Sequence, residues 1–432
     1  MAKQITEEEI DLLIERLVSR VNKANEVFLL NIGKYIKEIK NLSPSKAYQL
    51  VQILKYGGNF DEIMEKIMQY SGMNIQDVDA IFSNYAKRDQ YFYEKFYRYR
   101  NIPFIPFEQN TALKLQTMAL ANIVKVEMYD YFRENVLGYS IKDAKDNIVF
   151  KGMKDVYNEM LDTALLNVSQ GKETFDSSMR KILNEVGTSG LKTVDYKSGR
   201  SVRLDSALRM HLNSRLTELH NENQKIFGEE FGANGVEVTH HINAAPDHIN
   251  TVDGKQFALI DKIQEQINNG IETKIKQDDI RGNQVKVDGK WYDDFNAINN
   301  ALQRPVSELN CKHKIFSIIL GVSEPEYTQK ELDEDKKENI DGFNFEGKHY
   351  SNYEGTQLQR QLEREVRKQK DTQILAKASD NKELIATSQD NITKLTQKYK
   401  ELSKISGLPT YMNRMRVSGF KRVAKSKLKW YN

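Results

Sequence analysis

The sequence predicts a mainly α-helical protein with a smaller α+β domain. We expect a helical N-terminal region over residues 1–140, a mixed α+β domain with a His/Cys cluster over 141–325, a linker over 326–355 and a helical hairpin with a basic tail over 356–432. Two observations lead to this prediction. Apolar residues recur at helical spacing near both ends of the chain, and strand and turn signals concentrate between them. A charged fraction of 29% also fits a helix-rich, assembling protein better than a compact enzyme.

The N-terminal region begins with a helix that carries its own start signal. Thr6 and Glu9 have the spacing of a capping box, and the apolar residues from Ile10 to Val21 follow helical periodicity. Ser43-Pro44 and Gly57-Gly58 then mark the start and the end of a second helix. Further helices are predicted over 61–70, 74–87 and 111–136.

Aromatic residues are concentrated between Tyr91 and Tyr99, just before Pro103 and Pro106. Mixed with Lys95 and nearby arginines, these rings have the composition of a stacking surface for single-stranded nucleic acid. The alternative is a hydrophobic patch that faces a partner or another domain. A net charge of only +3 gives the nucleic-acid interpretation little support.

The middle of the chain combines helices with short strands. Helices are predicted over 152–170 and 174–186, followed by a β-hairpin over 191–204 with a glycine turn. Asp205 is expected to cap a long helix that ends near Phe231. We interpret its two histidines, His211 and His220, as surface or packing residues.

The stretch from Gly235 to Pro325 holds four of the seven histidines and the only cysteine. A strand is predicted over 236–242, and a turn at 245–247 then leads to His248. Residues 262–294 are polar and are expected to leave the core of the domain, with short strands near 285–287 and 290–292. A buried strand is predicted over 315–320.

Four side chains of this stretch form a candidate metal site. Imidazole and thiolate are preferred ligands of Zn²⁺, which takes four of them in structural sites. The spacing Cys-x-His and the proline turn predict convergence of His241, His248, Cys311 and His313. His240, on the opposite face of the predicted strand, is expected to stay outside. In the alternative, His241 and His248 bond to the backbone and Cys311 is a small buried hydrophobe.

Two enzymatic interpretations compete with a structural metal site. PDHINTVDGK, from Pro246, resembles the start of an HNH-type nuclease motif, but Cys311 and His313 lie too far along the chain for its short ββα unit. Cys311 and a histidine also have the side chains of a nucleophilic pair, without a recognisable oxyanion loop. No phosphate-binding or dinucleotide-binding motif is present.

The C-terminal part is predicted to be helical and basic. Charged residues over 329–338 indicate a solvated linker, and helices over 356–370 and 382–403 are predicted to pair as a hairpin. The tail 411–432 carries seven basic residues and no acidic one. Its expected partner is DNA phosphate or an acidic protein surface; the alternative is a tail that only aids solubility.

The composition also suggests a location. One cysteine excludes an internal disulfide and suits a reducing cytoplasm. No apolar run is long enough for a bilayer, and the first residues lack the apolar core of a signal peptide, so synthesis in the cytoplasm of a cell and no membrane association are expected.

Three motifs resemble the phage minor capsid protein 2 family, a relative of the Mu-type head-morphogenesis proteins. The first is the Val-Glu-Val strand from Val236 that is followed by His241, Pro246, His248 and a Gly-Lys pair. The second is Asn-Cys-Lys-His at 310–313 with the Gly-Val-Ser end at 321–323. The third is a C-terminal helix with Gln357, Arg360, Glu363, Arg364, Arg367 and Lys368.

This resemblance implies a virion protein present in few copies, associated with the portal protein and other capsid proteins and needed for head assembly or genome delivery. It implies no catalytic activity, so we expect a structural protein and not an enzyme. Zinc, where bound, is expected to be structural. The competing hypothesis is a metal-dependent nuclease or toxin, which an open metal position beside a general base would favour.

Overall fold

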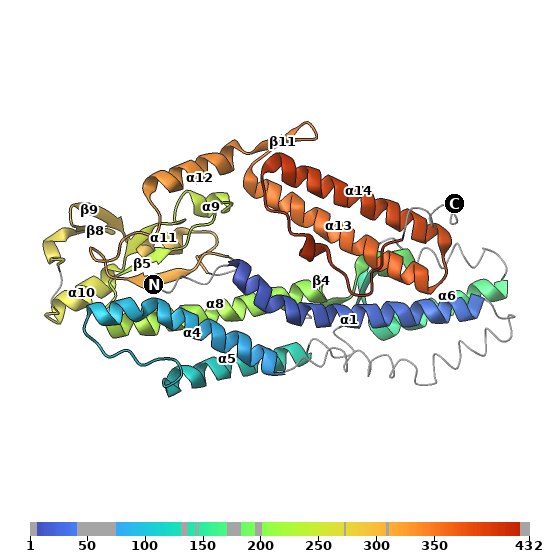
Figure 1. Ribbon diagram of the computed structural model, residues 1–432, viewed down its shortest axis with the longest axis horizontal. Coiled ribbons are helices and arrows are strands. Elements are labelled where there is room, and N and C mark those ends of the chain that lie inside the picture. Colours follow the sequence, from blue (N-terminus) through green and yellow to red (C-terminus); the bar gives the residue numbers. More distant parts are fainter. Residues whose placement is uncertain are drawn as a thin grey trace. The chain divides into compact units, whose positions relative to one another are not determined.

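The computed structural model describes residues 7–40, 75–130, 137–142, 145, 147–170, 183–194, 201–271, 274–307 and 311–423. Most of these residues are helical and the sheets are small, which confirms a mainly α fold with a smaller α+β part (Figure 1). The chain divides into two compact units. Unit 1 comprises 1–13, 76–124 and 210–356, and unit 2 comprises 14–75, 125–209 and 357–432.

The predicted helices are present where the structure describes them, although some of them are longer than predicted. Helix α1 spans Glu7–Lys40, α4 spans Ile75–Tyr99, α5 spans Thr111–Asp130, α6 spans Met153–Gln170 and α8 spans Leu204–Phe231. Helices α4 and α1 run further than their apolar periodicity indicated. The predicted cap at Thr6, the predicted helices between 43 and 70, residues 131–136 of the helix predicted over 111–136 and residues 174–182 of the helix predicted over 174–186 lie outside the described residues.

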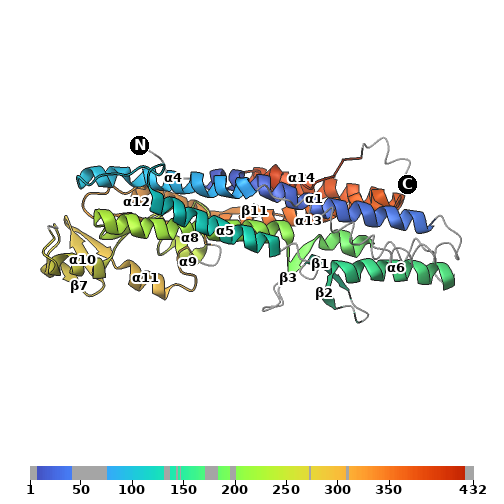
Figure 2. The same ribbon diagram turned by 90° about the horizontal axis from the view of Figure 1, so that it is seen from below.

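Tyr93, Phe96 and Tyr97 of α4 are buried in the core of unit 1, so their interpretation as a binding surface is wrong, whereas Tyr99 of the same stretch is exposed. Helices α4 and α8 lie side by side (Figure 1 and Figure 2). The Phe96 ring stacks on Phe231 of α8 with centroids 4.8 Å apart, and Tyr93, which is fully buried, contacts Phe231 at 5.8 Å. Pairs of large rings bury much apolar area, which stabilises packing between the helices.

A three-stranded antiparallel sheet follows α8 in unit 1. Its strands are β5 (Gly235–Val238), β6 (Gln256–Ala258) and β10 (Ile315–Ile318), in the order β10-β5-β6. All residues of β5 and β10 are buried, which agrees with the apolar runs in the sequence. The strand predicted over 236–242 ends at Val238, because the chain turns there into a loop. Short helices α9 (Pro246–Ile249), α10 (Ile260–Asn268) and α11 (Phe295–Ala301) lie around this sheet (Figure 1).

The polar excursion between α10 and α11 contains a small meander. Strands β7 (Ile280–Arg281), β8 (Gln284–Val287) and β9 (Lys290–Asp293) pair in order after a single 3₁₀ turn, η1 (Gln277–Asp279). The two predicted strands are confirmed. Helices α10 and α11 were not predicted, since each is too short for a clear helical period.

The charged run over 329–338, predicted to be a solvated linker, is mostly exposed but helical, and residues 326–355 contain regular secondary structure. Thr328 and Glu331 form a capping box that starts helix α12 (Gln329–Asp341), and strands β11 (Phe343–Phe345) and β12 (Lys348–Tyr350) pair as a hairpin. A reciprocal cap satisfies helical N–H groups that water would otherwise have to satisfy, and so stabilises even a highly charged helix. The division into four sequence segments as separate domains stays a prediction.

Unit 2 contains a second antiparallel sheet and long helices. Strands β1 (Leu137–Lys142), β2 (Ile148–Gly152), β3 (Lys192–Val194) and β4 (Ser201–Arg203) pair in the order β2-β1-β3-β4. The hairpin of β3 and β4 was predicted, whereas the hairpin of β1 and β2 was missed. Beside the sheet, Asp371 accepts hydrogen bonds from Arg203 at 2.8 Å and from Asn25 at 2.9 Å, so one buried carboxylate joins three distant segments.

The predicted helical hairpin is present at the C-terminal end. Helices α13 (Asn352–Ala378) and α14 (Lys382–Ser406) pack together, and Gly407 ends α14 in the left-handed conformation that glycine adopts without strain. Residues 411–423 then fold back on the hairpin through a second 3₁₀ turn, η2 (Met412–Met415). Met415 and Val423 are buried there. This half of the basic tail is therefore part of the fold and not a solvated extension.

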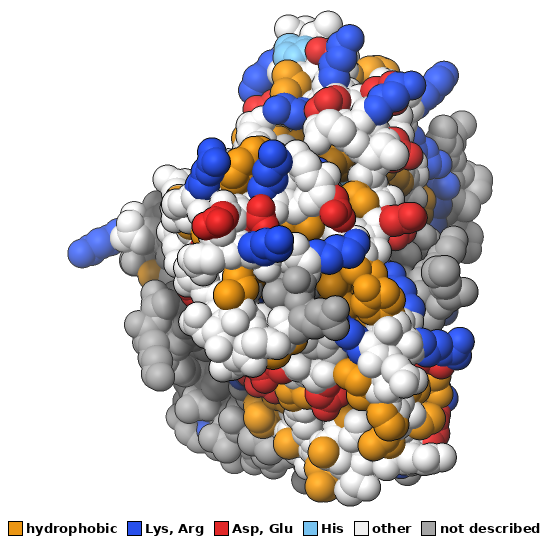
Figure 3. Space-filling view, turned by 90° about the vertical axis from the view of Figure 1, so that its left-hand side faces the viewer, with side chains coloured by type: hydrophobic (Ala, Val, Ile, Leu, Met, Phe, Trp, Pro, Cys, Tyr) orange, Lys and Arg blue, Asp and Glu red, His pale blue; other side chains and the backbone are white. Residues whose placement is uncertain are grey.

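The molecular surface in Figure 3 carries both signs of charge. Lysine and arginine side chains alternate with aspartate and glutamate side chains on that face, and hydrophobic side chains are scattered among them. Such mixing gives little long-range attraction for a polyanion. Among the described helices, none has a stretch apolar and long enough to cross a bilayer.

Candidate metal centre

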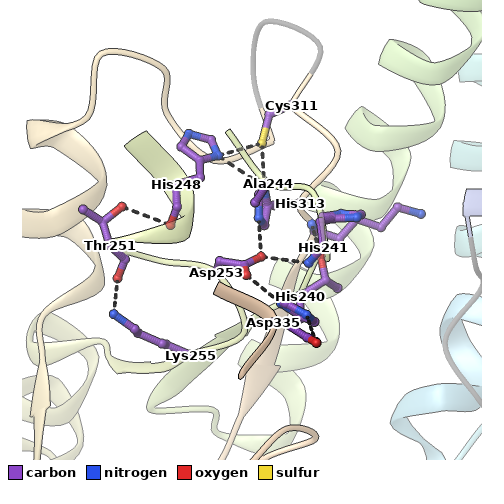
Figure 4. Close-up of polar contacts among 12 residues, drawn as sticks. His240, His241, Ala244, His248, Thr251, Asp253, Lys255, Cys311, His313 and Asp335 are labelled. Atoms are coloured by element: carbon purple, nitrogen blue, oxygen red, sulfur yellow. Dashed lines mark hydrogen bonds and ion pairs between the residues drawn. The ribbon is translucent and has the colours of Figure 1, made fainter. Parts of the chain in front are cut away.

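Three segments of unit 1 deliver the His/Cys cluster to one place. The loop after β5 carries His240 and His241, helix α9 carries His248, and the segment before β10 carries Cys311 and His313 (Figure 4). Pairing of β5 with β10 sets Val238 opposite Ile315. The two loops that leave this end of the strand pair therefore start side by side, which brings together residues that are far apart in the sequence.

Three of the four predicted ligands have converged. The Nδ1 atoms of His248 and His313 lie 3.2 Å apart, and the Sγ atom of Cys311 lies 3.5 Å from the first and 3.4 Å from the second. Both histidines are buried and Cys311 is half-buried. Among the described residues, these three form a group whose potential ligand atoms all lie within 4.8 Å of one another.

The hydrogen bonds of the two histidines fix the orientation of their rings. Nε2 of His248 donates to the backbone carbonyl of Arg304 at 2.7 Å, and Nε2 of His313 donates to the carboxylate of Asp253 at 2.8 Å. A carbonyl and an ionised carboxylate only accept, so each Nε2 carries the proton. In the neutral rings both Nδ1 atoms then present lone pairs toward each other and toward the sulfur.

The Arg304 carbonyl is itself held in place. The guanidinium of Arg304 is paired with Asp247, with Nε 3.0 Å from the carboxylate. Because Asp247 directly precedes His248 in helix α9, this ion pair links the helix to the residue whose carbonyl orients the His248 ring.

Asp253 organises the other side of the cluster and was missed by the sequence analysis. Its Oδ1 accepts from Nε2 of His313 and from the backbone N–H of His241, both at 2.8 Å. Its Oδ2 accepts from Nδ1 of His240 at 2.6 Å. A carboxylate that orients a histidine is a common partner of metal-binding imidazoles. An aspartate five residues after His248 is the signal that was present, but only the fold shows which way it points.

The two remaining histidines have different positions. His241 lies beside the cluster: its ring meets the His313 ring edge-on, with centroids 4.7 Å apart, and its Nε2 is buried without a hydrogen-bond partner. His241 is outside the group of three ligand atoms. His240 does not point into the cluster, as predicted, and its Nε2 bonds instead to Asp335 of α12 at 2.8 Å.

The electrostatics favour a thiolate next to an imidazole. Burial alone would raise the pKa of the Cys311 thiol, but the hydrogen bond and the charge of His313 outweigh it, and the net pKa is lowered. Burial would lower the pKa of His313, whereas Asp253 and Cys311 raise it. Burial and the nearby His313 lower the pKa of His241 to about 4, so this ring is neutral near pH 7.

The donor set fits a tetrahedral zinc ion. With Zn–N near 2.0–2.1 Å and Zn–S near 2.3 Å, a tetrahedron has edges of about 3.3 Å between two nitrogens and about 3.6 Å between nitrogen and sulfur. The three distances given above match those edges closely. The alternative, in which His241 and His248 bond to the backbone, is met in part, because His248 does bond to the Arg304 carbonyl. It does not account for the Nδ1 atoms of His248 and His313, which both lie beside the sulfur.

One comparison with known proteins gives a match. The family model described as phage minor capsid protein 2 matches residues 5–403, and so extends over residues of both units. No curated protein and no solved structure matches the chain significantly.

Proposed function

The chain belongs to the phage minor capsid protein 2 family, and from this premise we propose that it is a portal-associated protein of the phage head that acts in head assembly and in genome delivery. Family membership itself makes it a minor capsid protein of the virion that interacts with other phage structural proteins. The portal as neighbour and the role in delivery are the parts that we propose.

A single observation carries this proposal: the family match includes almost the whole chain. A match confined to the His/Cys segment would fit a small module carried by many kinds of protein. Here residues 5–403 include most of both units and nearly all of the helical hairpin. The proposal therefore concerns the whole protein, whose helices present long surfaces for assembly.

We further propose that the protein has a structural role and catalyses no reaction. Its membership of a structural capsid family supports this proposal. In the nuclease alternative, a histidine would activate water beside a metal with an open position. The carboxylate of the described cluster, Asp253, is already engaged by His313, His240 and the His241 backbone, so it orients ligands and is poorly placed as a general base.

DNA is a proposed second partner, through the basic tail. In its described half, Arg416, Lys421 and Arg422 are exposed while Met415 and Val423 are anchored in unit 2. Because the segment is already anchored, binding of phosphate by its three cationic side chains would cost little conformational entropy of the chain. An acidic protein surface is the competing partner.

The portal proposal is tested by cryo-electron microscopy of heads reconstructed without imposed symmetry. We expect density for this chain in contact with the portal ring. Heads from a phage that lacks the chain are the control, and the assigned density must disappear from them. Density only at sites distributed over the shell, remote from the portal, would contradict the proposal.

The two proposed roles are tested by producing that phage with and without complementation by the full chain. Failure to form heads without the chain would support the role in assembly. Heads that form and package DNA without the chain but fail to transfer the DNA to cells would support the delivery role and contradict a need for the chain in assembly. Heads that transfer DNA normally without the chain would contradict the delivery role.

A further inference from the structure

We propose that His248, Cys311 and His313 hold one zinc-class divalent cation, and that Asp253 and His240 connect this centre to helix α12. This inference does not depend on the portal role, because it rests on contacts within unit 1. It extends the candidate cluster from a set of ligands to a path between the metal and a surface helix.

The first step concerns the space between the two rings, where a positive charge, from a proton on one Nδ1 or from a metal ion, would be stabilised. Two neutral imidazole nitrogens that face each other at 3.2 Å repel unless a proton or a metal ion lies between their lone pairs. A thiolate at 3.4–3.5 Å from both supplies a third donor and a negative charge. Thiolate with imidazole is the donor combination that favours zinc over calcium and magnesium.

The second step concerns the fourth position of the tetrahedron. The three donors leave one vertex, for which His241 is the candidate. Its Nε2 is a buried nitrogen without a hydrogen-bond partner, and its ring already contacts His313. A buried polar atom without a partner is costly, and a metal ligand bond would remove that cost.

The third step follows the hydrogen bonds outward from His313. One carboxylate oxygen of Asp253 accepts a hydrogen bond from His313 and the other accepts one from His240, so the carboxylate links the two rings directly. The far nitrogen of His240 bonds to Asp335 of α12 at 2.8 Å. The path from the metal ligand to α12 thus consists of three consecutive hydrogen bonds, with Asp253 and the His240 ring almost fully buried.

Apolar and backbone contacts hold α12 over the same loop. Leu332 packs directly on Gly254, where any larger residue would collide with it. Asn339 donates to the backbone carbonyl of Ala244 at 3.1 Å and accepts from the backbone of Tyr353 at 3.0 Å. The loop between His240 and Gly254 therefore touches the metal ligands on one side and α12 on the other.

The consequence is that metal binding orders α12. A metal fixes the His313 ring, the ring fixes Asp253, and Asp253 fixes His240 against Asp335. Without the metal, the imidazole and thiolate can separate, and the hydrogen bonds beyond them lose their common anchor. Asp253 and His240 are positioning residues in this account, and neither is a ligand.

The ligand set is tested by measuring the metal content of the purified full chain. We expect about one zinc per chain, and a thiolate-to-metal charge-transfer band after replacement by cobalt. Since Cys311 is the only cysteine, that band reports on this site alone. Cys311→Ser should remove the band and most of the zinc. His349→Asn, a change of an exposed histidine on β12, should leave both unchanged. A wild-type chain without stoichiometric metal would overturn the site.

The connection to α12 is tested by hydrogen exchange with and without a chelator, using β5 as an internal reference. Chelation should speed exchange in α12 more than in β5. Asp335→Ala, which removes the acceptor of the His240 hydrogen bond, should keep the zinc and give fast exchange in α12 even with metal present. The matched control is Asp333→Ala, at an exposed aspartate on the same helix. Equal exchange of α12 in the two variants, or equal loss of protection in α12 and β5 on chelation, would overturn the connection to α12. The metal site would then still be supported by the measured zinc content.

Discussion

His248 and His313 bring their Nδ1 atoms to 3.2 Å although 65 positions separate them in the chain. The Nε2–H group of His248 donates a hydrogen bond to the Arg304 carbonyl, and the Nε2–H group of His313 donates one to the Asp253 carboxylate. The fold therefore builds a set of converging lone pairs at the edge of a small sheet, and a bound cation would offset the repulsion between them.

Removal of metal is predicted to lower the melting temperature of the protein. A ligand that binds only the folded state stabilises it by about 2.7 kcal/mol when its free concentration is 100 times Kd. We expect a chelator to lower the melting temperature of the wild-type chain and to leave Cys311→Ser, already less stable, almost unchanged. The control His349→Asn should respond like the wild type. Scanning calorimetry measures this, and a chelator effect of the same size in Cys311→Ser would argue against the cluster as its origin.

Phe231→Ala is predicted to destabilise unit 1 by about 3–5 kcal/mol, the usual cost of deleting a buried aromatic ring. Phe231 is 1% exposed and stacks on Phe96. Tyr99→Ala, on the same aromatic stretch but 55% exposed, should change stability by less than about 0.5 kcal/mol. Urea unfolding compares the two. A small effect of Phe231→Ala would restore the idea that these rings serve a partner.

Asp371→Asn is predicted to destabilise unit 2 by about 3–5 kcal/mol, because it removes the carboxylate that faces a buried guanidinium. The Arg203–Asp371 pair has side-chain exposures of 9% and 0%. The control is Asp390→Asn, which breaks an exposed pair with Lys394 on α14 and should cost less than about 1 kcal/mol. Denaturant unfolding of both variants provides the measurement. Equal stabilities would contradict a structural role of the buried pair.

Glu363→Gln is predicted to stabilise the C-terminal hairpin near neutral pH. Burial raises the pKa of Glu363 above its ordinary value of 4.5, against the opposing effects of Arg414 and Tyr399. The folded state therefore keeps its proton to higher pH than the unfolded state, so stability falls as pH rises from 4.5 through the folded pKa. Glutamine still accepts the Tyr399 hydrogen bond without the charge.

The test of this pH effect is thermal unfolding at several pH values. The gain in melting temperature from Glu363→Gln should grow as pH rises above 4.5, the ordinary pKa of the carboxyl group, and then level off. Glu401→Gln, an exposed change on α14, should show no such trend. A pH-independent difference would mean that packing, and not ionisation of Glu363, separates the variants.

Replacing Arg416, Lys421 and Arg422 together by glutamine is predicted to weaken binding of the full chain to duplex DNA. Each phosphate that a cation neutralises adds about −0.9 to the slope of log binding constant against log salt, so removal of three cations should make the slope shallower by about 2.7. The matched control replaces three exposed lysines of α14, Lys394, Lys400 and Lys404, and removes the same charge.

Substitution is preferable here to truncation at Tyr411. Truncation would also remove Met415 and Val423, which are buried, and would confuse the effect of charge with the effect of packing. If the tail and control variants bind DNA equally at every salt concentration, the tail is not a specific phosphate site. No binding by the wild-type chain at low salt would leave an acidic protein surface as the partner.

Local patterns in the sequence determined much of the secondary structure. Helical periodicity predicted α4, α6, α8, α13 and α14, and the glycine turn predicted the pairing of β3 with β4. These signals are local, because apolar spacing and capping depend on neighbours within a few residues. The ligand types and spacings also indicated His248, Cys311 and His313 before any geometry was known.

Only the tertiary structure decided which helices, strands and side chains contact one another. The charge run over 329–338 became helix α12 because Thr328 and Glu331 cap it and the loop of the candidate metal centre packs beneath it. The aromatic residues of α4 became core because α8 lies against them. Asp253 entered the site because β5 and β10 pair and bring its loop to His313. The cap of α12 is a local signal, whereas the other outcomes depend on contacts between distant residues, which composition and spacing alone do not fix.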